Sequence, residues 1–264
     1  MWPKLFSIGD FFLPTYGVLV ATGFFVALQV VVRQSKRSGI DPEKATNLAI
    51  YCAMAGLAGA KLLMFVFDFQ LYLQHPEEIF TMATLQAAGV FQGGLILAAA
   101  FAFWFMSRNQ MPPLVTADAF APGVAIGHAI GRLGCFAAGC CWGTACDRPW
   151  AVSFHNPEAY KLVGVPLDRP LHPAQLYEVF AEALLFAFLM WRSKQPHRPG
   201  QILGLYLVFS SISRFVIEFY RAHQQALPFD GPLSLTQWIA FVTLLPGAWL
   251  LLRPDRSPAL AAKA

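Results

Sequence analysis

The sequence predicts an all-α, polytopic membrane protein. Hydrophobic residues make up 56% of the 264 positions and charged residues only 13%, a balance that excludes an ordinary soluble domain. Apolar stretches of the length needed to cross a bilayer, about 20 residues, recur along the whole chain. Helices satisfy their own backbone hydrogen bonds in lipid, so we expect each stretch to cross as a helix.

Seven segments are predicted to span the membrane: Phe12–Val32, Thr46–Phe67, Ala87–Met106, Leu114–Cys135, Leu176–Trp191, Ile202–Tyr220 and Leu233–Leu252. The first lacks the short apolar run and small-residue cleavage site of a removable signal peptide, so we keep it as structure. The longest loop, residues 142–174, separates the fourth and fifth spans. We expect it to form a small extramembrane subdomain within one integral-membrane domain covering residues 1–264.

The basic residues predict the orientation. Eleven lie in loops on one side of the predicted spans: Arg33, Lys36, Arg37, Lys44, Arg108, Arg192, Lys194, Arg198, Arg253, Arg256 and Lys263. Five lie on the other side: Lys4, Arg148, Lys161, Arg169 and Arg221. Because cytoplasmic loops carry the excess of Lys and Arg, we expect the N-terminus outside and the C-terminus in the cytoplasm.

Several ionisable side chains fall inside the predicted spans. A charge at membrane depth costs at least about 2.5 kcal/mol on insertion scales, so each marks a candidate functional residue. Arg132 and Arg214 are flanked by apolar or small residues, and Glu218 shares a helix face with Arg214 at i+4. These groups fall at the depth of the outer leaflet, as do Tyr16, Lys61, Gln92 and Glu178.

Two simpler interpretations stay open for these charges. Lys61 can reach the interface along its own aliphatic stem, and Arg214 with Glu218 can form a purely structural ion pair. Asp118, at the inner end of the fourth span, is expected to cap a helix.

Glycines recur through the fourth span. Gly123, Gly127 and Gly131 lie four residues apart, a spacing typical of close helix packing. The following run, residues 135–143, contains few helix formers. We expect it to be non-helical or re-entrant, which membrane depth tolerates only beside a cavity or inside protein.

Together, the polar and glycine motifs resemble one known family. They are Tyr16-Gly17, Phe91-Gln92-Gly93-Gly94-Leu95, Gly131-Arg132-Leu133-Gly134, Trp142-Gly143, Asp147-Arg148-Pro149-Trp150, His172-Pro173-Ala174-Gln175-Leu176-Tyr177-Glu178 and Arg214-Phe215-Val216-Ile217-Glu218. Their joint order, from Tyr16 to Glu218, resembles the bacterial prolipoprotein diacylglyceryl transferases. No single motif is specific, but the order is.

The resemblance implies a bacterial inner-membrane enzyme that moves the diacylglyceryl group of phosphatidylglycerol onto the lipobox cysteine thiol of a lipoprotein precursor, releasing glycerol 1-phosphate. It implies no cofactor, no metal and no nucleic-acid partner. The catalytic residues expected from it are Arg132, Arg214, Gln92 and Glu218. The expected substrate-binding residues are Tyr16, Arg132, Gly143, Gly93, Gly94, His172, Tyr177 and Glu178. Two guanidinium groups suit the charge that develops on a departing phosphate.

Three positions depart from the family pattern. Gln92 stands where the family has His, Cys135 where it has Asn and Cys140 where it has Glu. Glutamine cannot act as a base near neutral pH. The base that takes the thiol proton therefore stays open among Glu178, His172, His128 and the field of the arginines.

Four cysteines form a cluster with the spacing C-x4-C-C-x4-C: Cys135, Cys140, Cys141 and Cys146. An oxidising location favours disulfides, while the spacing lacks the C-x2-C pattern of usual zinc sites. Packed free thiols and a redox or catalytic thiol also stay open.

Three other functions compete with the transferase prediction. A transporter places its charges near the midplane and has internal repeats, neither of which the sequence shows. A membrane thiol-redox protein explains the cysteines but not the paired arginines. A related lipid transferase with a different acceptor remains the third alternative.

Overall fold

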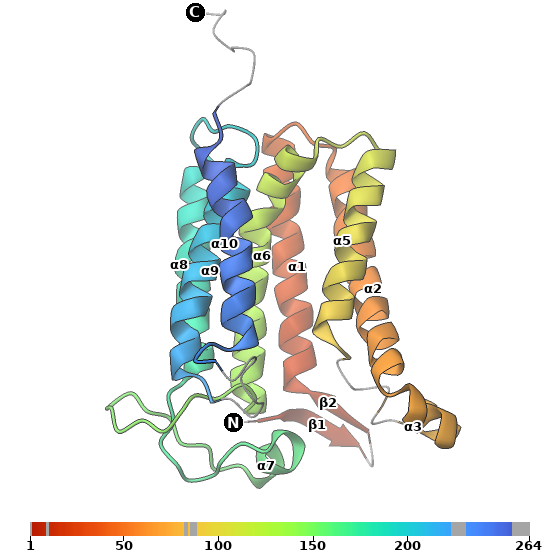
Figure 1. The fold of residues 1–264 in the computed structure, drawn as a ribbon, viewed down its shortest axis with the longest axis vertical. Helices are drawn as coiled ribbons and strands as arrows, with labels where there is room; N and C mark the ends of the chain where they lie inside the picture. Colours follow the sequence, from red (N-terminus) through yellow and green to blue (C-terminus); the bar gives the residue numbers. More distant parts are fainter. Residues whose placement is uncertain (1, 9–10, 82–83, 85–88, 223–230, 255–264) are drawn as a thin grey trace, which may run out of the picture. The chain divides into compact units, whose positions relative to one another are not determined.

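The computed structural model describes residues 2–8, 11–81, 84, 89–222 and 231–254. Within them, seven helices are long and apolar enough to cross a membrane: α1 (Thr15–Arg37), α2 (Pro42–Phe67), α5 (Phe91–Arg108), α6 (Pro113–Ala138), α8 (Ala174–Arg192), α9 continuing into η2 (Gln201–Tyr220) and α10 (Leu235–Leu252). The predicted all-α, seven-span fold is confirmed (Figure 1). The expected start of the third span, residues 87 and 88, lies outside the described residues, as do Arg256 and Lys263.

The chain divides into two compact units, residues 1–34 with 117–264 and residues 35–116. The prediction of one membrane domain stays a prediction.

The smaller unit is built on the contact between α2 and α5. Gly59 and Gly93 face each other so closely that a Cβ on either would lie 2.4 Å from the other's carbonyl oxygen. A Cβ on Gly94 would likewise lie 2.7 Å from the carbonyl oxygen of Gly56. Gly93 and Gly94, expected to bind substrate, thus let the two helices meet at backbone distance; their role in substrate binding stays a prediction.

The same unit contains two short helices after α2, namely α3 (Phe69–Gln74) and η1 (Pro76–Phe80). Lys61, near the end of α2, donates to the carbonyl oxygen of Thr84 at 2.5 Å.

The larger unit contains α6, α8, α9, α10 and most of α1 (Figure 1). Gly123 and Gly127 of α6 pack on α1, where a Cβ on Gly123 would meet the Ala27 carbonyl oxygen at 2.9 Å. The packing prediction is therefore confirmed for these two. It is wrong for Gly131, whose Cβ would have no heavy atom of the described residues within 4 Å.

Asp118 caps a helix, as expected. Its carboxylate accepts from the backbone N–H groups of Gly200 at 2.6 Å and Leu203 at 2.7 Å. These donors lie at the start of α9, so the carboxylate both satisfies orphan N–H groups and meets the positive end of the helix dipole. At the same end, Arg198 donates to the carbonyl oxygens of Leu251 and Arg253, tying α9 to α10.

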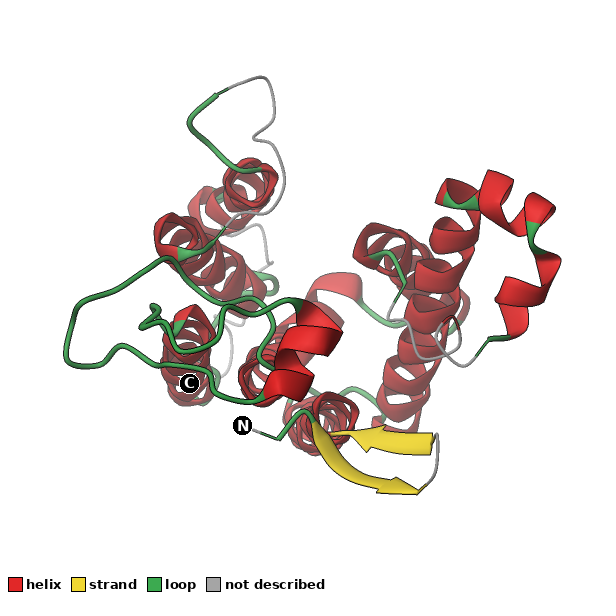
Figure 2. Cartoon of the chain, turned by 90° about the horizontal axis from the view of Figure 1, so that it is seen from below, coloured by secondary structure: helices red, strands yellow, loops and turns green. Residues whose placement is uncertain are grey.

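The connection between α6 and α8 folds over one end of the larger unit (Figure 2). It contains α7 (Pro157–Val163) and a small core of Trp142, Phe154, Ala159, Val165 and Leu171. This core gives the predicted loop subdomain its own packing. A hairpin of β1 (Lys4–Ile8) and β2 (Phe11–Pro14) is joined to α7 by an ion pair of 2.9 Å between Lys4 and Glu158.

Helix α6 is longer than the sequence predicted. It continues to Ala138, so the expectation of a non-helical run from Cys135 is wrong for residues 135–138. The chain leaves the helix at Gly139, which has φ +80°, and Cys141 follows at φ +62°. Gly139 adopts its positive φ at no steric cost, because glycine has no Cβ.

Candidate active site

A carboxylate, Glu178 near the start of α8, lies at the centre of the candidate site. Its Oε2 is 2.6 Å from Nε of Arg132 on α6, and its Oε1 is 2.5 Å from Nη1 of Arg214 on α9. The Glu178 side chain is 4% exposed, and the two arginines are 16% and 21% exposed. Three helices therefore bring both predicted arginines to one buried acceptor.

A second carboxylate and a third arginine extend this network. Glu218 lies 3.5 Å from Nη2 of Arg214 and accepts from the Ser234 hydroxyl at 3.1 Å. Arg221 lies 3.9 Å from Glu178 and 3.7 Å from Glu218. Of the two carboxylates, Glu178 makes the shorter contact with the guanidinium group of Arg214.

Three guanidinium groups thus surround two carboxylates. Each guanidinium group stays protonated and carries five N–H donors, more than these carboxylates can occupy. The remaining donors are suited to bind an anionic group such as a phosphate.

The same nitrogen of Arg132 that faces Glu178 also contacts a histidine. This Nε atom lies 3.2 Å from Nε2 of His128, one turn earlier on α6. Nδ1 of that ring lies 3.3 Å from Oε1 of Glu182, which also accepts from the Ser210 hydroxyl at 2.8 Å. An arginine can only donate, so Nε2 is the accepting nitrogen in this contact, and Nδ1 is directed at Glu182. Nε2 also lies 3.7 Å from Oε2 of Glu178.

Gly143 holds together the backbone beside this network. It donates to the His172 carbonyl oxygen at 3.0 Å and forms a bridge with Arg221. A Cβ here would lie 2.4 Å from the His172 oxygen and 2.6 Å from that of Tyr220. Only glycine fits, and the close contact positions the chain that carries Arg221.

His172 and Tyr177, both expected to bind substrate, belong to an aromatic cluster. His172 Nδ1 lies 2.9 Å from the Tyr177 hydroxyl, which accepts from the Trp150 indole at 2.9 Å. The Tyr220 ring packs edge-on against both, at 5.1 Å and 6.1 Å between centroids.

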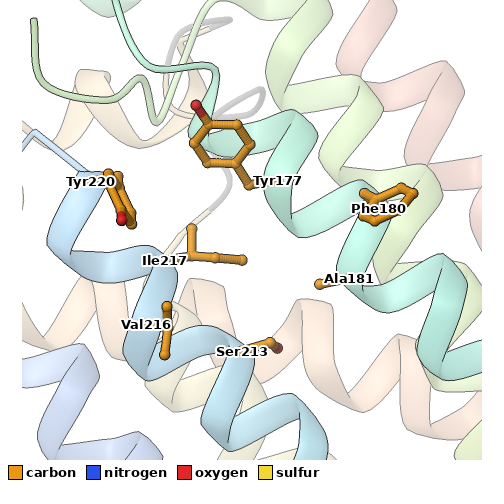
Figure 3. Close-up of a pocket in the computed structure, with 7 residues that line it drawn as sticks. All are labelled: Tyr177, Phe180, Ala181, Ser213, Val216, Ile217 and Tyr220. Carbon is orange, nitrogen blue, oxygen red and sulfur yellow. The ribbon is translucent and has the colours of Figure 1, made fainter. Parts of the chain in front are cut away.

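A cavity of about 500 Å³ opens between α8 and α9 next to these rings (Figure 3). Its lining is almost wholly apolar: Tyr177, Phe180, Ala181, Ser213, Val216, Ile217 and Tyr220. Two lining residues are followed in the sequence by members of the charged network. Tyr177 precedes Glu178, and Ser213 precedes Arg214.

Tyr16, at the start of α1, lies against α6 just beyond Arg132. A Cβ on Gly134 would lie 3.2 Å from its ring. Gln92, together with Gly93 and Gly94, belongs to the smaller unit, where Gln92 is exposed at the start of α5.

Three cysteines converge where α6 ends. The Sγ atoms of Cys135, Cys140 and Cys141 lie within 4.8 Å of one another, and no disulfide links the described cysteines. Hydrogen bonds from the Cys135 and Cys140 thiols lower the pKa of the Cys141 thiol, and the Arg221 and Arg132 charges act in the same direction.

Reasoning from the sequence missed Glu182 and gave Arg221 no role in the site. Glu182 follows Glu178 by four residues, so both lie on one face of an otherwise apolar helix, and that spacing was a usable signal. Arg221 offered none, because its place depends on the backbone bridge to Gly143.

Comparisons with known proteins agree with this geometry. The family described as "Prolipoprotein diacylglyceryl transferase" matches residues 3–253. Proteins named phosphatidylglycerol–prolipoprotein diacylglyceryl transferase are similar to this chain over nearly its whole length. That of Clostridium tetani is 29% identical over 95% of this chain and 96% of its own length. Those of Vibrio campbellii and Ruegeria pomeroyi are 32% and 31% identical, over 94% and 97% of this chain and 89% and 96% of their own lengths.

Seven spanning helices, the meeting of Arg132 with Arg214, and a match over nearly the whole sequence point the same way. The chain belongs to the prolipoprotein diacylglyceryl transferase family and is a multi-pass membrane transferase.

Proposed function

We propose that this chain transfers the diacylglyceryl group of phosphatidylglycerol to the thiol of the lipobox cysteine in a lipoprotein precursor. The observation that carries the proposal is the meeting of Arg132 and Arg214 on Glu178. The names of the relatives contain both substrates, phosphatidylglycerol and a prolipoprotein.

In this reaction the cysteine sulfur attacks the diacylglyceryl carbon. The C–S bond forms while the C–O bond to phosphate breaks, and the electron pair leaves with glycerol 1-phosphate. The rate depends on stabilising the charge that grows on the phosphate oxygens. Arg132 and Arg214 would bind those oxygens through the guanidinium N–H groups that Glu178 does not occupy.

Glu178 would hold both guanidinium groups in place before the lipid arrives. Donors fixed in advance need no reorganisation during the reaction. Glu218 would position Arg214 and Arg221 from the other side, held by the Ser234 hydroxyl. The network would therefore bind an anion without collapsing around it.

The thiol must lose its proton, because the thiolate is the nucleophile. We propose His128 as the proton acceptor, since Glu182 holds its Nδ1 and leaves Nε2 as the basic nitrogen. When Arg132 turns to the phosphate, Nε2 would be released from its contact with that arginine. His128 would then supply the base that Gln92 cannot supply. The positioning role of Gln92 stays a prediction from the sequence.

The apolar cavity between α8 and α9 would take an acyl chain of the lipid beside its phosphate. In the sequence as a whole, eleven lysines and arginines fall in the predicted loops on the side away from the site, where Arg192 ends α8 and Arg253 follows α10, and five fall in loops on the side of the site. That distribution supports a bacterial inner-membrane location with the site toward the outside, the N-terminus outside and the C-terminus in the cytoplasm.

The test uses purified protein, phosphatidylglycerol vesicles and a lipobox peptide. We expect glycerol 1-phosphate in solution and a peptide heavier by one diacylglyceryl group, both measured by mass spectrometry. A peptide with Ser in place of Cys should give neither product. Release of glycerol phosphate without modified peptide would indicate another acceptor, and no reaction by a folded protein would contradict the proposal.

A further inference from the structure

The cluster of Cys135, Cys140 and Cys141 has no part in the transfer reaction proposed above. Cys135 lies in the last turn of α6 and is 8% exposed, and the other two are half-buried in the turn that follows. The three sulfur atoms lie within 4.8 Å of one another. Cys146, also buried, lies outside this group.

This spacing is close to that of sulfur ligands around a metal ion. With metal–sulfur bonds of about 2.3 Å, three thiolates around one ion are about 3.8–4.0 Å apart. Each sulfur would need to move by less than about 1 Å to reach such a geometry, which a change of χ1 supplies. The sulfur atoms come from residues 135, 140 and 141, so the short turn at the end of α6 already brings them together.

The number of sulfur atoms distinguishes a metal site from a disulfide. A disulfide joins two thiols at about 2.05 Å and leaves the third without a role. All three pairs are close here, which an ion with three ligands requires and a disulfide does not. Thiolates select soft ions such as Cu(I) and Zn(II).

The surroundings are compatible with a bound cation and its thiolates. The group lies at the C-terminal end of α6, close to the guanidinium group of Arg132. Nη1 of Arg132 lies 4.0 Å from the Cys135 sulfur and would offset the negative charge of three thiolates. Structural Zn(II) is four-coordinate, and the group offers only three ligands, so we expect Cu(I) to bind more tightly than Zn(II).

We propose that Cys135, Cys140 and Cys141 form a binding site for one soft, thiophilic metal ion beside the candidate active site. Binding replaces three S–H bonds by three metal–sulfur bonds and releases three protons to solvent, with no change of oxidation state. The proposal does not depend on the transferase activity.

The experiment titrates reduced, purified full-length protein in detergent with Cu(I) and, separately, Zn(II), each buffered by a competing chromogenic chelator. We expect one Cu(I) per chain, with thiolate-to-metal charge-transfer absorption in the ultraviolet, and weaker binding of Zn(II). Cys135→Ser, Cys140→Ser and Cys141→Ser should each lower the Cu(I) affinity at least about tenfold. Cys52→Ser and Cys146→Ser are the matched controls and should leave the affinity unchanged.

A second measurement uses the wild-type chain, so that a folding defect in a variant cannot decide the outcome. Bound Cu(I) should protect the three cysteines, but not Cys52, from alkylation, as read by peptide mass spectrometry. The proposal is overturned by binding that survives Cys135→Ser/Cys140→Ser/Cys141→Ser, by equal loss in the control variants, or by an intact mass showing two of the three thiols oxidised to a disulfide before metal is added.

Discussion

Two helix contacts in this protein are built in opposite ways. Helices α2 and α5 meet through Gly59 and Gly93, with backbone against backbone. Helices α6, α8 and α9 meet around Glu178 and its arginines. The first contact brings two backbones together at glycines, whereas the second is built on buried ionised side chains. Charges at membrane depth cost free energy on insertion, so the second contact points to chemistry as well as packing.

The largest expected effect is on the charged contact. Arg132→Lys and Arg214→Lys keep the charge but remove the planar, bidentate donor, so each should lower the transfer rate by about 10³-fold. The lipobox peptide assay measures this. Arg192→Lys, at the other end of α8, is the control and should retain the wild-type rate. An equal loss in all three variants would remove the distinction between the contacts.

Glu178→Gln tests whether the shared carboxylate holds three helices together. Removing one partner of a buried ion pair costs about 3–5 kcal/mol, because the remaining charges stay unpaired. We expect a lower midpoint of thermal unfolding in detergent, together with loss of activity. Glu77→Gln, an exposed carboxylate paired with His75, should leave the midpoint unchanged. An unchanged midpoint in Glu178→Gln would show that the network contributes nothing to stability.

His128→Gln tests the proposed proton acceptor. Loss of a general base costs about 10²-fold or more in rate. The pH–rate profile of the variant should differ from that of the wild type, because the reaction has lost its proton acceptor. Affinity for phosphatidylglycerol should change little. A slower variant that keeps the wild-type pH profile would assign His128 to positioning of Arg132.

The smallest expected effect is on the uncharged contact. Gly59→Ala places a Cβ 2.4 Å from the Gly93 carbonyl oxygen and should cost about 1–3 kcal/mol of unfolding free energy. Gly56→Ala, on the same helix, meets nothing closer than 3.9 Å and should be tolerated. Thermal unfolding of both variants measures the difference. Equal midpoints would show that the close backbone contact between α2 and α5 contributes nothing to stability.

Hydropathy alone predicted the seven spans, and the boundaries differ from the observed helices by a few residues. The position of each residue within its predicted span also placed Arg132, Arg214, Glu178 and Glu218 at one level of the membrane. These features are local, since they depend on how many apolar residues follow one another along the chain. The resemblance of the motif order supplied the family, which the comparisons confirmed.

Only the tertiary structure decided which of these groups touch. Three contacts depend on how each helix is rotated about its axis. They are the ion pairs of Glu178 with both arginines, the contact of Glu182 with His128, and the contact of Arg221 with Glu178. The convergence of three cysteine sulfurs depends on where α6 ends, which the expected break at Cys135 misplaced. Helix rotation and termination are set by packing against neighbours that are distant in sequence, and hydropathy carries no information about that packing.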